Sequence, residues 1–385
     1  MTLFKTLNRK NTRSAKWDSA QKKTKNPDVI PMSVADSDYA TAPSIIEALK
    51  DRVDHGAFGY TYSDKTFYDT LSAWIKRRYG FAIKDDWVLT APKVLTALAI
   101  AVEANTDVDE AVVIQTPVYH MFAKTIKGIK RTVVNNPLNR QGTTYTMDLE
   151  NLEQHFKAGV KTFVLCSPHN PVGRVFTPQE LDALLTLCKA YDVTIISDEI
   201  HADLIMEGNH FHSMGQYFNP YENIVIVHAP SKAFNLAGLQ TAFIIAKNAR
   251  LKTRIKELLD RYYLSSLNTL GLTALIAAYQ HGDAFIDAQN DHIFKQYNRL
   301  KARLKSINPA IDVTPLEGTY LAWVDARAVF QTKHALTTQF EASGVVVSEG
   351  STFAKEYEGF FRLNLACSHD QLETVLNRIE NILKP

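Results

Sequence analysis

The segment that decides the fold is residues 162–199, which read TFVLCSPHNPVGRVFTPQELDALLTLCKAYDVTIISDE. Two short apolar runs, Thr162–Cys166 and Val193–Ser197, enclose a stretch with helical character at Pro178–Tyr191. Pro178 suits the first turn of that helix, where its missing N–H costs nothing. A strand, a helix and a second strand in succession predict a parallel sheet with helices on both faces.

The same alternation continues on either side of this unit. Further strands are expected at Ala111–Gln115, Ile224–His228 and Thr241–Ala246, and helices at Ser44–Val53, Phe67–Tyr79 and residues 92–104. The predicted fold class is therefore α/β, with a mostly parallel central sheet in a large domain over residues 45–275. In such sheets, ligands bind beyond the carboxyl ends of the strands.

The pattern changes after Leu270. Residues 271–306 are long and helical, and they precede expected strands at Tyr320–Val324, Gly344–Val347 and Gly359–Asn364 and a closing helix at His369–Leu383. These elements predict a smaller α+β domain over residues 276–385, of which the N-terminal arm, residues 1–44, forms a part. Two domains are also what 385 residues suggest.

Charge and hydropathy exclude several classes of protein. The formal net charge is +2, so the chain has no global attraction to nucleic acid or to an anionic membrane. The apolar runs have strand length, and the polar start at Met1–Lys10 lacks a signal-peptide pattern. The basic residues of the first 30 positions indicate a solvated arm. Nucleic-acid binding is the alternative, which the scarcity of aromatic residues there weakens.

The cysteines indicate the compartment. Cys166, Cys188 and Cys367 are odd in number and widely spaced, which favours free thiols in a reducing environment. The chain has no C-x-x-C pair and no His/Cys cluster at metal spacing, so no metal is expected. These features predict a cytoplasmic protein.

Three polar side chains follow neighbouring strands of the predicted sheet. Asn170 comes after the first strand of the opening segment, Asp198 after the second, and Lys232 after the apolar run 224–227. Each has an ordinary alternative, namely a turn asparagine, a helix N-cap and a surface lysine. Together they present an amide, a carboxylate and an amine to one crevice. That set suits a pyridoxal phosphate site, because a lysine with a lowered pKa forms a Schiff base and a carboxylate keeps the pyridine nitrogen protonated.

Other residues complete such a site. Tyr119 ends an earlier strand and is expected to stack on the cofactor ring. The turn at Pro92–Leu95 opens a helix, so the backbone of Val94 and Leu95 is a candidate for the phosphate, with the hydroxyl of Ser231 beside it. Arg362 lies within an apolar strand, where it predicts either a clamp for a substrate carboxylate or a structural salt bridge.

The chain resembles the fold-type I pyridoxal-phosphate enzymes of the aminotransferase class I/II superfamily along nearly its whole length. The segments that carry the resemblance are Ser14–Asp18, Met32–Asp38, Phe58–Thr61, Ser167–Arg174, Ser197–Leu204, Ser231–Gly238, Glu317–Tyr320 and Arg362–Cys367. Within the superfamily it is most similar to the MalY/PatB-type group of cystathionine β-lyases, also called cysteine-S-conjugate β-lyases.

The resemblance implies a role for each of these residues. Lys232 is the Schiff-base and catalytic lysine, Asp198 pairs with the pyridine nitrogen, and Asn170 bonds the phenolic oxygen. Tyr119 stacks on the ring, and Arg362 holds the substrate carboxylate. The resemblance further implies contacts of the cofactor or substrate with residues at four other positions: Asp36 on the substrate, Tyr60 on the cofactor or substrate of a partner subunit, and Ser231 and His201 near the cofactor. For His201, packing in the core is an equal alternative.

The implied assembly is a homodimer with shared active sites, and the implied reaction is α,β-elimination to a thiol, pyruvate and ammonia in sulfur amino-acid metabolism. The alternative is an aminotransferase that uses the same residues. Two positions depart from the family pattern, namely Lys93, where the family usually has glycine, and Ser33, where it often has tryptophan. A DNA-binding regulator on this fold is disfavoured, because only about 40 residues precede the helix at residue 43.

Overall fold

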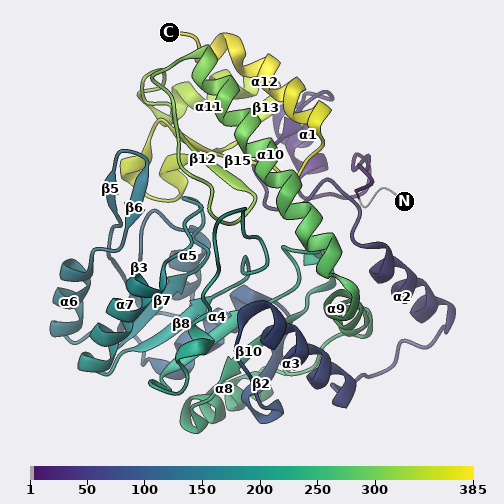
Figure 1. Ribbon diagram of the computed structural model, residues 1–385, viewed down its shortest axis with the longest axis vertical. Coiled ribbons are helices and arrows are strands. Elements are labelled where there is room, and N and C mark those ends of the chain that lie inside the picture. The colour runs from purple at the N-terminus through teal and green to yellow at the C-terminus, as the bar shows by residue number, and fades with distance from the viewer. Residues whose placement is uncertain (1–3) are drawn as a thin grey trace.

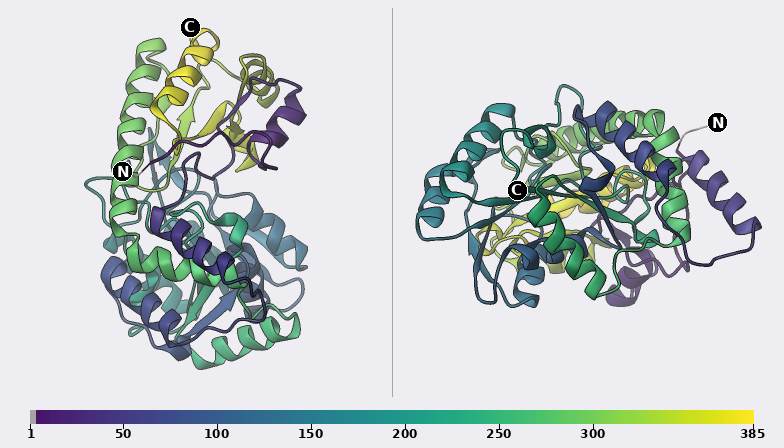
Figure 2. Two further views of the ribbon diagram at one scale, coloured as in Figure 1. Left: turned by 90° about the vertical axis from the view of Figure 1, so that its right-hand side faces the viewer. Right: turned by 90° about the horizontal axis from the view of Figure 1, so that it is seen from below.

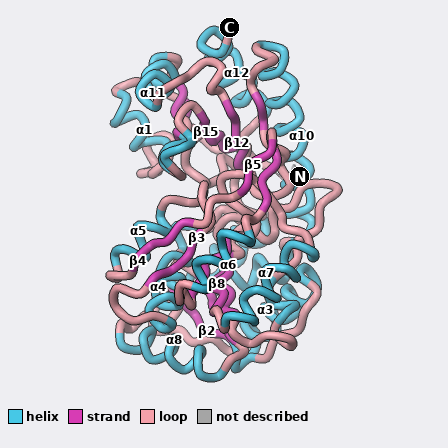
Figure 3. Tube along the Cα trace, turned by 90° about the vertical axis from the view of Figure 1, so that its left-hand side faces the viewer, coloured by secondary structure: helices cyan, strands magenta, loops and turns pink. Residues whose placement is uncertain are grey.

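The computed structural model describes residues 4–385 (Figure 1). Residues 1–3, which open the polar N-terminal stretch, lie outside the described residues. The chain forms a larger body around a seven-stranded sheet and a smaller body around a four-stranded sheet. Figure 3 shows the strands inside each body with helices around them. The predicted α/β fold class is confirmed.

The large sheet of the described chain has the strand order β2-β10-β9-β8-β7-β3-β4. The bounds are β2 (Val88–Ala91), β3 (Ala111–Ile114), β4 (Thr132–Asn135), β7 (Thr162–Cys166), β8 (Thr194–Asp198), β9 (Ile224–His228) and β10 (Ala242–Ala246). Strands β4, β3, β7, β8 and β9 pair in parallel, whereas β10 is antiparallel to both of its neighbours. Strands β2 and β4 escaped prediction; they are the two edge strands of this sheet, and β4 is only partly buried.

Two helical layers cover the large sheet, and alternate strand residues face each of them. In β7, Phe163 and Leu165 pack into one apolar cluster, and Val164 and Cys166 pack into the other. Burial on both faces explains why these strands are continuous apolar runs. The first cluster includes α2 (Pro43–Asp54), α3 (Lys65–Tyr79), α6 (Leu149–Lys157), α7 (Pro178–Tyr191) and α9 (Thr269–His281), and the second includes α4 (Val94–Asn105), α5 (Met121–Gly128) and α8 (Ala249–Arg261).

The smaller body joins both ends of the chain. Its sheet has the order β11-β12-β15-β14, and Figure 2 shows the N-terminal segment in purple beside the C-terminal part in yellow. The expected strand Gly344–Val347 is shortened to β13, which pairs in parallel with β1, and a separate strand, β14, follows it and pairs with β15. The remaining bounds are α1 (Trp17–Thr24), β1 (Ile30–Pro31), β5 (Asn139–Gln141), β6 (Thr144–Thr146), α10 (Asp283–Ile307), β11 (Asp312–Val313), β12 (Leu321–Asp325), α11 (Lys333–Ala342), β13 (Val345–Val346), β14 (Ser348–Glu349), β15 (Phe360–Asn364) and α12 (His369–Leu383).

The long helical stretch predicted over residues 271–306 is two helices that meet at Gly282. A Cβ atom at this position would lie 2.2 Å from the carbonyl oxygen of Ala278 and 2.4 Å from the ring of Phe234. A side chain therefore does not fit between α9 and α10, and the chain changes direction there. Helical periodicity alone did not reveal this break.

The prediction of a solvated N-terminal arm is wrong for two of its cations. The side chain of Lys16 is fully buried, and its Nζ lies 2.9 Å from Oδ2 of Asp38. Arg9 donates from both terminal nitrogens to Asp36, at 2.7 and 2.8 Å. Carboxylates inside the fold compensate the burial of these charges. Neither cation is therefore free to bind nucleic acid.

Three further observations concern the residues described. The three cysteines are free and buried. Across residues 4–385, no helix combines the length and the apolar character that a bilayer crossing requires. Within the same range, no group of His, Cys, Asp or Glu is arranged to hold a metal ion.

Candidate active site

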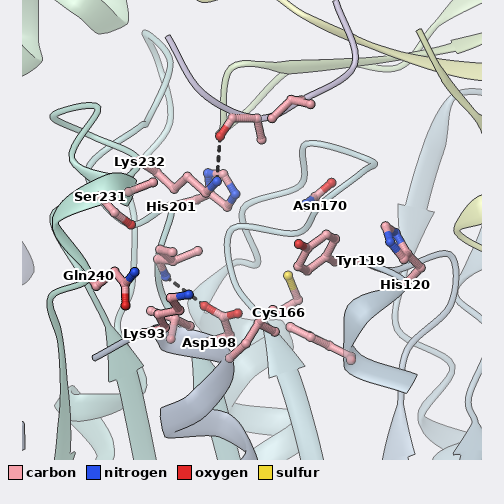
Figure 4. A pocket seen from close by; sticks show the side chains of 18 of the residues that line it. Lys93, Tyr119, His120, Cys166, Asn170, Asp198, His201, Ser231, Lys232 and Gln240 are labelled. Carbon is pink, nitrogen blue, oxygen red and sulfur yellow. Dashed lines mark hydrogen bonds between the residues drawn. The ribbon is translucent and has the colours of Figure 1, made fainter. Parts of the chain in front are cut away.

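A cavity of about 490 Å³ lies where the carboxyl ends of the large-sheet strands meet the smaller body. Figure 4 shows side chains from both sides pointing into it. It brings together ten of the predicted or questioned positions, namely Lys93, Val94, Leu95, Tyr119, Asn170, Asp198, His201, Ser231, Lys232 and Arg362. Parallel strands end at the same edge, so residues far apart in sequence converge there.

Lys232 follows β9 and lines this cavity. Burial, aided by the positive charge of Arg362, lowers the pKa of its amine to about 8. The carboxylates of Asp36 and Asp198 act in the opposite direction. The Nζ atom donates a hydrogen bond to the carbonyl oxygen of Ala35 at 2.6 Å. A substantial fraction of this amine is neutral near pH 8, which is the nucleophilic form.

Asp198 is the last residue of β8, and only 5% of it is exposed. One carboxylate oxygen accepts a hydrogen bond from the backbone N–H of Ile200 at 3.1 Å. Burial raises the pKa of this carboxyl group to about 7. A buried carboxylate is stabilised by a cationic donor. The protonated nitrogen of a pyridine ring is such a donor, so the site fits the expected cofactor.

Arg362 lies in β15, buried beside Asn170. Its Nη1 donates to Oδ1 of Asn170 at 2.8 Å, and its Nη2 donates to the carbonyl of Ser33 at 2.7 Å. Burial lowers the pKa of the guanidinium to about 10, so it remains a cation at neutral pH. No carboxylate forms a salt bridge with it in the described chain, and its Nε has no partner. The alternative of a structural salt bridge therefore fails, and a substrate carboxylate suits this cation.

The start of α4 forms another wall of the cavity. The helix begins at Val94, and no side chain caps it. Its first N–H groups therefore lack the capping partner that a helix usually has, and they suit a phosphate. Lys93, in an extended conformation before the helix, and Ser231 line the same cavity.

The imidazole of His201 lacks a hydrogen bond that a packed core histidine usually makes. Only 3% of it is exposed, and its buried Nδ1 has no hydrogen-bond partner. Burial, together with the charges of Lys232 and Arg362, holds the pKa of its imidazole well below the usual range, so the ring is neutral. Its ring meets that of Tyr320 edge-on at 6.0 Å. The free nitrogen favours a role toward a bound group.

Two predicted residues do not line the cavity. Asp36 is not among the residues that line the cavity, and its carboxylate pairs with Arg9. Tyr60 has a relative exposure of 111% in the loop between α2 and α3. It makes no contribution to the cavity of its own chain, which is compatible with a partner's site.

Sequence reasoning missed other groups on the cavity wall. The carbonyl of Ala35 is a backbone group, and no residue type signals its position. His120 directly follows Tyr119 and lines the cavity, and burial lowers the pKa of its imidazole. The position of His120 directly after Tyr119, the predicted ring-stacking residue, could have indicated that it lines the site.

Comparison with known proteins agrees with this geometry. The model of the family "Aminotransferase class I and II" matches residues 27–379. The chain belongs to this family. It is 36% identical to cystathionine beta-lyase PatB of Bacillus subtilis, with both chains covered completely, and 32% identical to protein MalY of Escherichia coli, with 99% of this chain and 98% of the relative covered. The predicted similarity to the MalY/PatB-type group is confirmed.

Solved structures give the same result. Cystalysin from Treponema denticola, whose crystal structure contains pyridoxal 5'-phosphate, superposes with a TM-score of 0.96 at 31% identity. The match covers 99% of this chain and 98% of cystalysin. Both bodies of the fold are therefore shared with that protein.

Proposed function

We propose that this chain eliminates the sulfur substituent of cysteine S-conjugates, such as L-cystathionine, and releases a thiol, pyruvate and ammonia. The observation that carries the proposal is that one cavity contains the amine of Lys232, the carboxylate of Asp198 and the guanidinium of Arg362. This guanidinium has no carboxylate partner among the described residues. The relatives named cystathionine beta-lyase support elimination as the outcome.

The cofactor and the class of reaction agree with the prediction. Pyridoxal 5'-phosphate is the cofactor of this chain, and the chain is a carbon–sulfur lyase that depends on it. When bound, this cofactor supplies a carbonyl carbon for amine attack and a ring that accepts electrons from the substrate. The substrate range within this class is part of the proposal.

Seven side chains and one helix start are proposed to hold the cofactor. Lys232 binds it covalently, and Asp198 keeps its ring nitrogen protonated. Asn170 and His201 donate or accept hydrogen bonds at its ring, and Tyr119 packs on the ring face. The phosphate is assigned to the backbone of Val94 and Leu95 at the start of α4, with Ser231 and Lys93 beside it.

Arg362 and Lys232 are proposed to act on the substrate. Arg362 holds the carboxylate and so orients the Cα–H bond toward Lys232. The substrate amine would first displace the amine of Lys232 from the cofactor. The freed amine, whose neutral form burial favours, would then take the Cα proton as a general base. The thiolate then leaves from Cβ and takes up a proton. Hydrolysis by water then gives pyruvate and ammonia, and we assign no residue to this last step.

A product assay tests the proposal. Pyruvate and thiol should appear in equal amounts from L-cystathionine or an S-alkyl cysteine when no oxo acid is added, and L-cystine should give pyruvate and a persulfide. The reason is that elimination needs only the substrate and water. Turnover that requires an oxo acid and yields no pyruvate would instead establish the alternative, an aminotransferase.

We also propose a homodimer with shared active sites. Four large hydrophobic side chains stand exposed, at Phe58, Tyr60 and Tyr62 in the segment before α3 and at Tyr263 after α8. The hydroxyl of Thr269 donates to the carbonyl of Gly59 at 3.2 Å, which holds the loop before α3 against the start of α9. Exposed apolar side chains gathered in this way are typical of a protein interface.

Coexpression of two inactive variants tests this arrangement. Lys232→Ala removes the amine of one subunit, and Tyr60→Ala removes the residue proposed to reach the partner's site. A mixed dimer should have one intact site, so activity should return when the two variants are coexpressed. Activity that stays absent, or a molar mass of one chain by light scattering, would contradict shared sites.

A further inference from the structure

The backbone carbonyl of Ala35 lies on the cavity wall and accepts two hydrogen bonds. Nζ of Lys232 donates to this oxygen at 2.6 Å, and the hydroxyl of Tyr320 donates to it at 2.9 Å. Figure 4 shows the bond from Lys232 as a dashed line. A carbonyl oxygen has two lone pairs, so the two donors saturate it.

The chain on both sides of this carbonyl is held in place. The side-chain amide of Asn364 donates to the carbonyls of Val34 and Asp36, at 2.7 Å each. The carboxylate of Asp36 is fixed by Arg9. The Ala35 carbonyl shares its peptide plane with the N–H of Asp36, which donates to the carbonyl of Val34 at 3.0 Å. Lys232 and Tyr320 donate to the Ala35 oxygen itself.

Tyr320 is built into the smaller body rather than into the large sheet. It directly precedes β12 and is fully buried. Its ring packs edge-on against His201, whereas its hydroxyl reaches the Ala35 carbonyl. Loss of the hydroxyl would leave the ring packing in place and remove one bond to the acceptor of Lys232.

We propose that Tyr320 is a positioning residue, which holds the Ala35 carbonyl so that this oxygen anchors the ammonium form of Lys232 after proton removal from the substrate. In this step the Cα–H bond breaks, the proton joins the lone pair of Nζ, and the bonding electrons stay with the substrate. The inference rests on the proposed role of Lys232 as that base. An ammonium group that is withdrawn from bulk water is stabilised by a hydrogen-bond acceptor, and this carbonyl supplies one.

The test compares two tyrosine hydroxyls that both donate to backbone carbonyls. Tyr320→Phe removes the bond to Ala35. Tyr297→Phe is the matched control, because the buried Tyr297 donates to the carbonyl of Thr314 at 3.1 Å, away from the cavity. Exchange of the Cα proton of L-alanine for deuterium, followed by proton NMR on the holoenzyme, measures proton removal without a leaving group.

Tyr320→Phe should slow the exchange at saturating alanine about tenfold. The variant loses the hydrogen bond from the tyrosine hydroxyl to the Ala35 carbonyl, which is the acceptor for the charged amine of Lys232. The alanine concentration for half-maximal exchange should change by less than about twofold, since Arg362 still binds the carboxylate. Tyr297→Phe should exchange alanine at the wild-type rate. Both variants should bind the cofactor with the wild-type absorbance and should lose similar thermal stability, which excludes a merely structural effect.

Exchange by Tyr320→Phe at the rate of Tyr297→Phe would overturn the inference. Should Tyr320→Phe fail to fold, Tyr320→Met removes the hydroxyl with a flexible apolar side chain and carries the same expectation. A wild-type enzyme that exchanges the proton but releases no thiol would end the proposed elimination and leave this inference standing. A wild-type enzyme that does not exchange the proton would overturn the inference itself.

Discussion

Lys232→Ala should abolish thiol release, with a fall on the order of 10⁴-fold or more, because one amine serves as the cofactor link and as the general base. The absorbance of the lysine-linked cofactor should disappear as well. The structure shows the amine in the cavity with Asp198 and Arg362. A spectrum before and after addition of pyridoxal phosphate and a thiol assay measure both effects.

A matched control is Lys10→Ala. Lys10 also donates to a backbone carbonyl, that of Pro27 at 2.7 Å, but it lies outside the cavity. This variant should keep the absorbance and the turnover. A lysine-linked band that survives in Lys232→Ala would disprove the assignment.

The wild-type protein adds a pH dependence to this prediction. The pKa of Lys232 lies near 8 because burial disfavours its charge. Below that pH the amine is protonated and unreactive, and above it the neutral amine attacks the cofactor. The rate of cofactor uptake by the cofactor-free protein should therefore rise with pH, with a midpoint near 8. A midpoint above 10 would contradict the effect of burial.

Asp198→Asn should lower thiol release by about 10²- to 10³-fold while the cofactor stays bound to Lys232. The asparagine has the same shape and can still accept from the N–H of Ile200. It lacks the negative charge that holds a proton on the ring nitrogen, and loss of one partner of a buried ion pair costs about 3–5 kcal/mol. Absorbance titration and steady-state kinetics separate the retained binding from the lost turnover.

The same variant makes a prediction about stability without the cofactor. The folded pKa of Asp198 is raised to about 7, above the ordinary value of an aspartate. The stability that this group contributes is therefore present at low pH and is lost as the pH rises through 7. Cofactor-free Asp198→Asn should be more stable than the wild type at pH 8, by thermal denaturation. Asp198→Glu, which keeps the charge, should recover part of the turnover, and equal turnover of Asn and Glu variants would refute the role of the charge.

Much of the large body was predictable from local patterns. The strands β3, β7, β8, β9 and β10 are short apolar runs, and burial on both faces makes such runs easy to recognise. The pattern failed where burial was partial or where contacts were distant. Strand β4 lies at an edge, and the break at Gly282 depends on the ring of Phe234, about 50 residues away in the chain.

The same distinction between local patterns and distant contacts applies to the residues of the candidate site. Asn170, Asp198 and Lys232 could be predicted because each lies at or just after the end of a strand, and strand ends of a parallel sheet converge. The ion pair of Asp36 with Arg9 could not be predicted, because the packing of the N-terminal arm brings the two residues together. Tyr320 was missed as a functional residue because its hydroxyl acts through a backbone carbonyl.

The sequence by itself determined the fold class, the family and the cofactor chemistry of this protein. These depend on residue types and on the order of strands and helices, both of which are local. The tertiary structure decided the electrostatic state of the site, namely which amine loses its proton, which carboxylate lacks a cation and which guanidinium has no carboxylate partner. Those properties arise from burial and from neighbours brought together across the two bodies, and they are absent until the chain has folded.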